Sequence, residues 1–216
     1  MPVYKEGLAG VIMPTLNSVM AAIRYYEAQG GTASIFVNDD GMQLVTADLA
    51  EARKAYYEVN RVGWCSRRGH CEDKESPNYF LRKGKFKKAS NMNYCLYFAM
   101  RVEDQWLKLM DDVCQQRGIS REDLSVDEEL QLYEAAKESI LEQDGGKTQA
   151  GGDCRLGELI LIIDSDTRVP EDCLLYGALE MEESPEVGVL PYQCSLTLTT
   201  LLGRPTPTRI RCYASY

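Results

Sequence analysis

The chain has 216 residues, enough for one α/β domain with a sizeable hydrophobic core. Apolar residues make up 44% of the sequence and charged residues 26%, and these proportions exclude global disorder. The formal net charge of −9 excludes a general nucleic-acid-binding protein, which would present a basic surface.

The first part of the sequence alternates between helical and extended patterns. Apolar residues at helical spacing predict helices, and β-rich runs that end in polar turns predict strands. The expected elements are a helix from Leu16 to Ile23 that stops before Gly30, a strand at 34–37 with a polar turn at 38–41, a helix at 48–58, a strand at 62–65 and a loop at 66–84.

The alternation continues in the second part. The expected elements are a long helix from Ser90 to Val113, a helix opened by a capping box at 125–128 and ending near Glu142, a loop at 144–152, a strand at 158–163, and a helix that starts at Pro170 and ends at Ser184. The strand at 158–163 is almost continuously apolar, which predicts burial on both faces. Strands that alternate with helices indicate an α/β fold with a mostly parallel sheet.

Cysteine and histidine usage limits the kinds of site. The eight cysteines include no C-x-x-C pair, which argues against a disulfide framework and a zinc knuckle and favours reduced, intracellular thiols. The single histidine, His70, excludes a histidine-rich metal site. No signal peptide is visible, and the longest apolar run, at 159–163, is too short to cross a bilayer. We therefore expect this chain, as written, to be soluble and cytoplasmic.

Paired carboxylates follow two of the predicted strands. Asp39 and Asp40 come after the strand at 34–37, and Asp164 and Asp166 come directly after the strand at 158–163. Open α/β sheets bind ligands beyond the carboxyl ends of their strands. Asp164 and Asp166, two apart in an extended chain, would point the same way and suit Mg or Mn, with substrate phosphates supplying further ligands. The alternative is that these acids only cap the following helices.

A basic run precedes the long helix. Residues 82–88 contain five cations in seven positions, which is unusual in an acidic protein. Because the run lies just before a helix N-terminus, it predicts a phosphate-binding segment, with a solvated basic turn as the alternative. Together with the two acidic strand ends, it predicts a site for a metal and a diphosphate.

Four motifs, in order along the chain, are similar to those of family 2 glycosyltransferases. Residues 2–6 (PVYKE) resemble the P-x-Y-[NK]-E opening, and residues 38–41 (NDDG) resemble the D-D-G turn. Residues 88–93 (KASNMN) resemble the K-A-G-N-L-N segment of relatives of cellulose, chitin and hyaluronan synthases. Residues 164–166 (DSD) resemble the D-x-D motif. Over roughly residues 2–188, the amino-acid sequence is most similar to uncharacterised fungal members of this family.

The resemblance implies a GT-A fold, a Rossmann-type arrangement for nucleotide-diphospho-sugar transfer. It implies a nucleotide-sugar donor, often UDP-linked, a Mg or Mn ion, and a glycan or lipid acceptor. Full-length relatives are embedded in a membrane with the catalytic domain facing the cytosol. Carried over by motif, the donor-binding residues are Tyr4, Glu6, Asp39, Asp40, Lys88 and Asp164, and the metal ligands are Asp164 and Asp166.

Two departures from the family pattern affect the expected activity and the expected domain boundaries. No E-D or Q-x-x-R-W motif follows Asp166 at a suitable distance, so no catalytic base is assigned and we expect little or no transfer activity from this polypeptide. The segment 190–216 has no acidic residue and predicts a divergent, irregular tail. We therefore expect a GT-A domain over 1–189, with a helical insertion at about 103–150, that lacks parts of the fold at both ends.

Two other functions remain open. An apolar strand followed by D-x-D-x-T is also typical of haloacid dehalogenase-type phosphatases, in which Asp164 would be the nucleophile and Asp166 the acid/base. A fragment that binds a nucleotide, or binds a partner through the acidic helices around 103–142, without turnover is the second alternative.

Overall fold

The computed structural model describes residues 1–82, 88–184, 186, 188–189 and 209–213. The strands are β1 (Pro2–Val3), β2 (Thr32–Asp39), β3 (Gly63–Arg67), β4 (Thr148–Gly151), β5 (Leu159–Ile162) and β6 (Arg209–Tyr213). The helices are the π-helical η1 (Leu8–Ile12), α1 (Met13–Glu27), α2 (Ala47–Val59), α3 (Lys88–Arg117), the 3-10 helix η2 (Arg121–Asp123), α4 (Val126–Gln143) and α5 (Cys173–Glu183).

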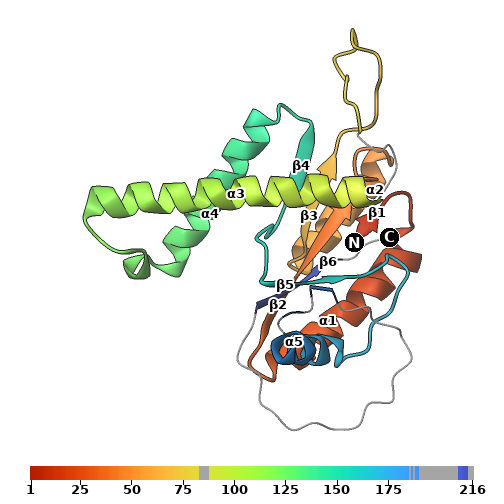
Figure 1. Ribbon diagram of the computed structural model, residues 1–216. Helices are drawn as coiled ribbons and strands as arrows, with labels where there is room; N and C mark the ends of the chain where they lie inside the picture. Colours follow the sequence, from red (N-terminus) through yellow and green to blue (C-terminus); the bar gives the residue numbers. More distant parts are fainter. Residues whose placement is uncertain (83–87, 185, 187, 190–208, 214–216) are drawn as a thin grey trace.

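The described strands form one mixed sheet in the order β4-β3-β2-β6-β5 (Figure 1). All pairs are parallel except β3 with β4. Strand β1 pairs with the carboxyl end of β2, at Asn38 and Asp39, whereas β6 pairs with residues 32–36 of the same strand. Short β1 therefore lies beside the D-D-G turn and brings residues 2–6 to that end of the sheet.

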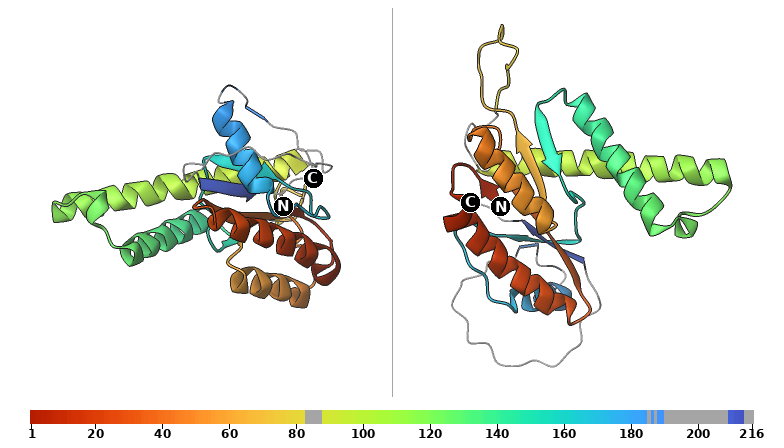
Figure 2. Two further views of the ribbon diagram at one scale, coloured as in Figure 1. Left: turned by 90° about the horizontal axis from the view of Figure 1, so that it is seen from below. Right: turned by 180° about the vertical axis from the view of Figure 1, so that it is seen from behind.

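The two faces of β2 enter separate hydrophobic cores, because side chains alternate along a strand. Ile35 and Val37 belong to the larger core, together with residues of α1, α2 and α5. Phe36 belongs to a second core with residues of β3, α3 and α4. Helices α1 and α2 lie on one side of the sheet and α3 on the other (Figure 2).

Helices α3 and α4 form a pair that extends away from the sheet (Figure 1). The predicted capping box begins α4, with the Ser125 hydroxyl and the Glu128 carboxylate each bonded to the other residue's backbone N–H. At the far end of the pair, a third cluster contains Met110, Cys114 and Leu124.

The α/β class with a mostly parallel sheet flanked by helices is confirmed, and the arrangement is consistent with a GT-A-like fold. Three local expectations need correction. The expected loop at 144–152 contains strand β4, which pairs with β3. The sequence of β4 has no apolar alternation that would predict a strand. The last helix starts at Cys173 rather than Pro170. Residues 209–213 form β6, although we predicted an irregular segment over 190–216; residues 190–208 and 214–216 lie outside the described residues.

The expectation that the strand at 158–163 is buried on both faces is also wrong. Strand β5 pairs only with β6 among the described strands, so it stands at an edge of the sheet. Leu159 and Leu161 pack against the larger core, whereas Ile160 and Ile162 are 46% and 53% exposed. The strand is thus covered on one face only.

In the part of the chain that the structure describes, every helix is too short or too polar to cross a membrane.

Candidate functional site

A pocket of about 240 Å³ opens at the carboxyl end of the sheet. It is lined by Pro2, Val3, Tyr4, Glu6, Asp40, Lys88 and Asn91. These residues come from β1 and the segment after it, from the turn after β2, and from the first turn of α3. Four of the residues predicted to bind the donor, Tyr4, Glu6, Asp40 and Lys88, therefore line one pocket.

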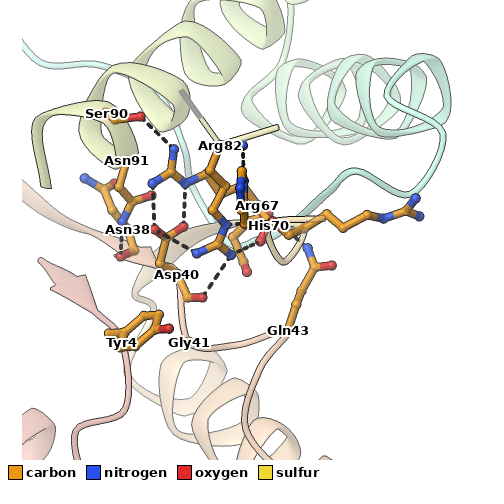
Figure 3. A network of polar contacts seen from close by, with 12 residues as sticks. Tyr4, Asn38, Asp40, Gly41, Gln43, Arg67, His70, Arg82, Ser90 and Asn91 are labelled. Carbon is orange, nitrogen blue, oxygen red and sulfur yellow. Dashed lines mark hydrogen bonds and ion pairs between the residues drawn. The ribbon is translucent and has the colours of Figure 1, made fainter. Parts of the chain in front are cut away.

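Asp40 is held by two buried arginines (Figure 3). Arg67, at the end of β3, donates from Nε and Nη2 to the two carboxylate oxygens at 2.7 and 2.8 Å. Arg82 places Nη1 3.2 Å from Asp40 Oδ2 and donates from Nη2 to the carbonyl oxygen of Arg67 at 2.9 Å. Burial lowers the pKa of the Arg82 guanidinium, and the Asp40 carboxylate opposes this effect.

Two guanidinium groups against one carboxylate leave a net charge of +1 around Asp40, and both arginines lie buried behind the pocket lining. Arg67 also donates to the Ser90 hydroxyl at 2.8 Å, and Asn91 donates to the carbonyl of Asn38 at 3.0 Å. The first turn of α3 is thereby tied to the ends of β2 and β3. The site is thus held by hydrogen bonds from three elements, and the excess positive charge behind Asp40 favours an anionic group.

Asp39 lies beneath the pocket rather than in its lining. Its carboxylate accepts from Arg53 Nη1 at 2.8 Å and from the Tyr57 hydroxyl at 2.9 Å, and the residue is fully buried. Burial, only partly offset by the nearby Arg53, raises the pKa of Asp39 from 3.8 to about 6. Burial and then Asp39 raise the pKa of Tyr57 well above 10. Arg53 also donates to the carbonyl of Glu6 at 2.8 Å, which joins Asp39 to the pocket-lining segment.

The D-x-D segment forms a turn, not the extended chain that we predicted. The amide of Thr167 donates to the carbonyl of Asp164 at 3.1 Å, which closes the turn after β5. Ser165 in its middle is fully buried, whereas the Asp164 side chain is 44% exposed and Asp166 is exposed. The turn thus presents both acidic residues at the surface.

Lys88 connects the D-x-D turn to the pocket. It lines the pocket, and its Nζ lies 3.7 Å from Asp164 Oδ1. The motifs at the start, middle and end of the predicted domain therefore meet at one edge of the sheet. Residues 83–87 of the predicted phosphate-binding run lie outside the described residues, which include only Arg82 and Lys88 of that run.

The described residues near the turn supply two carboxylate ligands for a magnesium or manganese ion, so the remaining ligands would come from water and substrate. Asp164 and Asp166 supply carboxylate oxygens, and the described residues contain no group of three or more His, Cys, Asp or Glu side chains that could hold a metal. Mg²⁺ keeps several waters and is commonly bound by one or two carboxylates and substrate phosphates. Two exposed carboxylates beside Lys88 and the pocket fit that mode of binding.

The structure brings several residues into the site that the sequence did not assign. Arg67 lies at the carboxyl end of β3. Its position just after a predicted strand could have identified it as a site residue, because ligands bind at the carboxyl ends of strands. Arg53 and Tyr57 on α2 carried no such signal, because their helical spacing predicts only a face packed on the core. Trp64 of β3 is 8% exposed and belongs to the larger core.

Comparison with known proteins gives one match. The family model described as glycosyl transferase family group 2 matches residues 159–206, which begin with β5 and include the D-x-D turn and α5. No curated protein and no solved structure matches the chain significantly. The match extends beyond Val189, past the end of the resemblance that the motifs alone indicated. It supports a glycosyltransferase of family 2 and does not favour a phosphatase.

Proposed function

We propose that the pocket binds a nucleotide-diphosphate sugar, UDP-linked, together with Mg²⁺ or Mn²⁺, for glycosyl transfer to a glycan or lipid acceptor. The observation that carries this proposal is the contact of Lys88 with Asp164, which joins the pocket to the D-x-D turn inside the segment that matches the family. A cation between the pocket and two exposed carboxylates suits a diphosphate that is shared with a metal ion.

Four of the residues that line the pocket have a role in this proposal. Tyr4, Glu6 and Asp40 would contact the nucleotide, and Asp39 supports the Glu6 backbone through Arg53. Lys88 places its ammonium group on the diphosphate. The net positive charge around Asp40 attracts the same anion. Asp164 and Asp166 would hold the metal, which when bound stabilises negative charge on the departing diphosphate.

No described residue is assigned as the base that activates an acceptor hydroxyl. We therefore expect this polypeptide to bind the donor nucleotide with little or no transfer. Sugar transfer at the rate of an ordinary enzyme, on the order of 10 s⁻¹, by the purified chain would contradict this expectation.

The binding test uses UDP and Mn²⁺ with the whole chain. We expect Mn²⁺-dependent UDP binding by calorimetry, and a higher melting temperature when both are present. Asp166→Asn should weaken UDP binding in Mn²⁺ about tenfold or more without changing stability, because the side chain is exposed. Glu171→Gln is the matched control, since it neutralises another exposed carboxylate close by in the chain and should bind as the wild type does.

Two results would count against the proposal. The first is an absence of Mn²⁺-dependent UDP binding in the wild-type chain. The second is hydrolysis of a phosphomonoester such as p-nitrophenyl phosphate that is lost in Asp164→Asn, which would favour the phosphatase alternative.

A further inference from the structure

The D-x-D turn is anchored through its middle residue. Ser165 is fully buried between Asp164 and Asp166, which both reach the surface. The hydroxyl of Ser165 has no hydrogen-bond partner among the described residues, so its side chain does not anchor the turn. The anchoring group is the Ser165 backbone carbonyl.

That carbonyl accepts a hydrogen bond from helix α1. The Thr15 hydroxyl, on a residue that is 1% exposed, donates to the Ser165 carbonyl at 2.6 Å. One helical turn later, the Ser18 hydroxyl accepts from the amide of Val169 at 3.2 Å and donates to the Thr15 carbonyl at 2.8 Å. Two hydroxyls on one face of α1 thus hold the chain on both sides of Asp166.

Thr15 is suited to this role by its shape. A threonine in a helix has few accessible side-chain rotamers, so its hydroxyl has only a small set of directions before the turn docks. Groups that orient metal-binding carboxylates are commonly hydrogen-bond partners one step removed from the ion, and their loss costs about 10- to 100-fold in metal affinity. Removing the Thr15 hydroxyl keeps both carboxylates in the chain but removes the hydrogen bond that holds the backbone between Asp164 and Asp166.

We propose that Thr15 is a positioning residue for the D-x-D carboxylates, acting through its hydrogen bond to the backbone carbonyl of Ser165. This inference rests on the proposed function, because it assumes that Asp164 and Asp166 bind Mn²⁺ together with a nucleoside diphosphate. It assigns to α1, which contributes no residue to the pocket lining, a part in setting metal affinity.

The experiment compares two substitutions in the whole chain, with Mn²⁺ and UDP as probes. Thr15→Val keeps the shape of the side chain and removes the hydroxyl, whereas Thr15→Ser keeps the hydroxyl. Bound Mn²⁺ is measured from the loss of the free-ion electron paramagnetic resonance signal in the presence of UDP. We expect Thr15→Val to weaken Mn²⁺ binding about tenfold and Thr15→Ser to stay within about twofold of the wild type.

A control variant separates positioning from general loosening. Tyr56→Phe removes a hydroxyl that bonds to Asn17 on α1 at 3.1 Å, away from the turn, and should leave Mn²⁺ affinity unchanged. If Thr15→Val does not fold, Thr15→Ala removes the same hydroxyl with less bulk, and the same outcomes apply.

The outcomes distinguish the two proposals. Wild-type binding together with unchanged affinity in Thr15→Val, or equal weakening in Thr15→Ser, contradicts the role of Thr15 and leaves the proposed function standing. A wild-type chain that binds no Mn²⁺ with UDP overturns both.

Discussion

Adjacent carboxylates at the end of β2 have different surroundings. Asp39 and Asp40 follow each other in sequence, but neighbouring side chains on a strand point to opposite faces. Asp39 therefore enters the side of the sheet that α2 covers, where Arg53 and Tyr57 bind it. Asp40 faces the pocket wall, between Arg67 and Arg82. The motif predicts both acids at the nucleoside, whereas only Asp40 lines the pocket.

The buried Asp39 makes stability depend on pH. Its pKa is raised from 3.8 to about 6, so the folded state binds this proton more tightly than the unfolded state does. The contribution to the free energy of unfolding is present below pH 3.8 and is lost as the pH rises through about 6. A shift of about two units corresponds to a change on the order of 3 kcal/mol.

The test compares wild type with Asp39→Asn in urea denaturation between pH 4 and 7. The stability of wild type relative to Asp39→Asn should fall as the pH rises, while Asp48→Asn, at an exposed carboxylate on α2, should follow the wild type. The carboxyl ¹³C shift of Asp39 should titrate with a midpoint near 6. A midpoint at or below about 4, the value for a free carboxyl, would contradict the expected effect of burial.

At the scale of elements, the turn after β2 lies against the segment after β1. The amide of Gly41 donates to the carbonyl of Val3 at 3.1 Å, and a Cβ added at Gly41 would lie 1.5 Å from the carbonyl oxygen of Tyr4. Only glycine allows this approach. The glycine of the D-D-G motif is therefore required by the packing of two backbone segments, and one of these segments carries the pocket residues Tyr4 and Glu6.

Gly41→Ala should displace residues 3–6 from the turn. We expect a loss of about 2–4 kcal/mol in the free energy of unfolding, measured by urea denaturation, and weaker UDP binding. Gly10→Ala is the matched control, because a Cβ there meets nothing within 4 Å. It should be neutral or stabilise by up to about 1 kcal/mol. Equal stability of the two variants would contradict the close approach.

At the scale of the whole molecule, the structure divides into the two cores on the sheet and a separate helical extension. Cys95, Phe98 and Val102 on the first half of α3 pack into the core that contains Phe36 of β2. Further along the helix, Met110 and Cys114 pack only into the small third cluster. One long helix therefore passes from a core that the sheet supports to one formed by the helix pair and the segment that joins its two helices.

Amide hydrogen exchange should reveal this division. The amides of Phe98 and Val102 should exchange at least about tenfold more slowly than those of Met110 and Cys114, because opening the end of the helix pair exposes only the small cluster. Both regions belong to the same helix, so each serves as the reference for the other. Uniform protection along α3 would mean that the helix opens as one unit.

Much of the secondary structure could be predicted because its signals are local. The apolar stripe on α3 and the capping box at Ser125 lie within a few residues of the elements that they define, and both helices are confirmed. Strand β4 escaped prediction because its four residues, TQAG, carry no apolar alternation and gain their order from pairing with β3. The prediction that the strand at 158–163 is buried on both faces was wrong for a related reason. Composition does not distinguish a central strand from one at an edge.

The sequence alone determined the order of the main helices and of strands β2, β3 and β5, and it carries the four motifs. These motifs predicted four of the seven residues that line the pocket. Only the tertiary structure decided that Asp39 lies under the pocket and that Arg67 and Arg82 hold Asp40. It also decided that Thr15 holds the D-x-D turn. The physical reason is that motifs depend on local spacing, whereas these contacts join residues far apart in the chain, and they form only when the sheet brings the ends of its strands together.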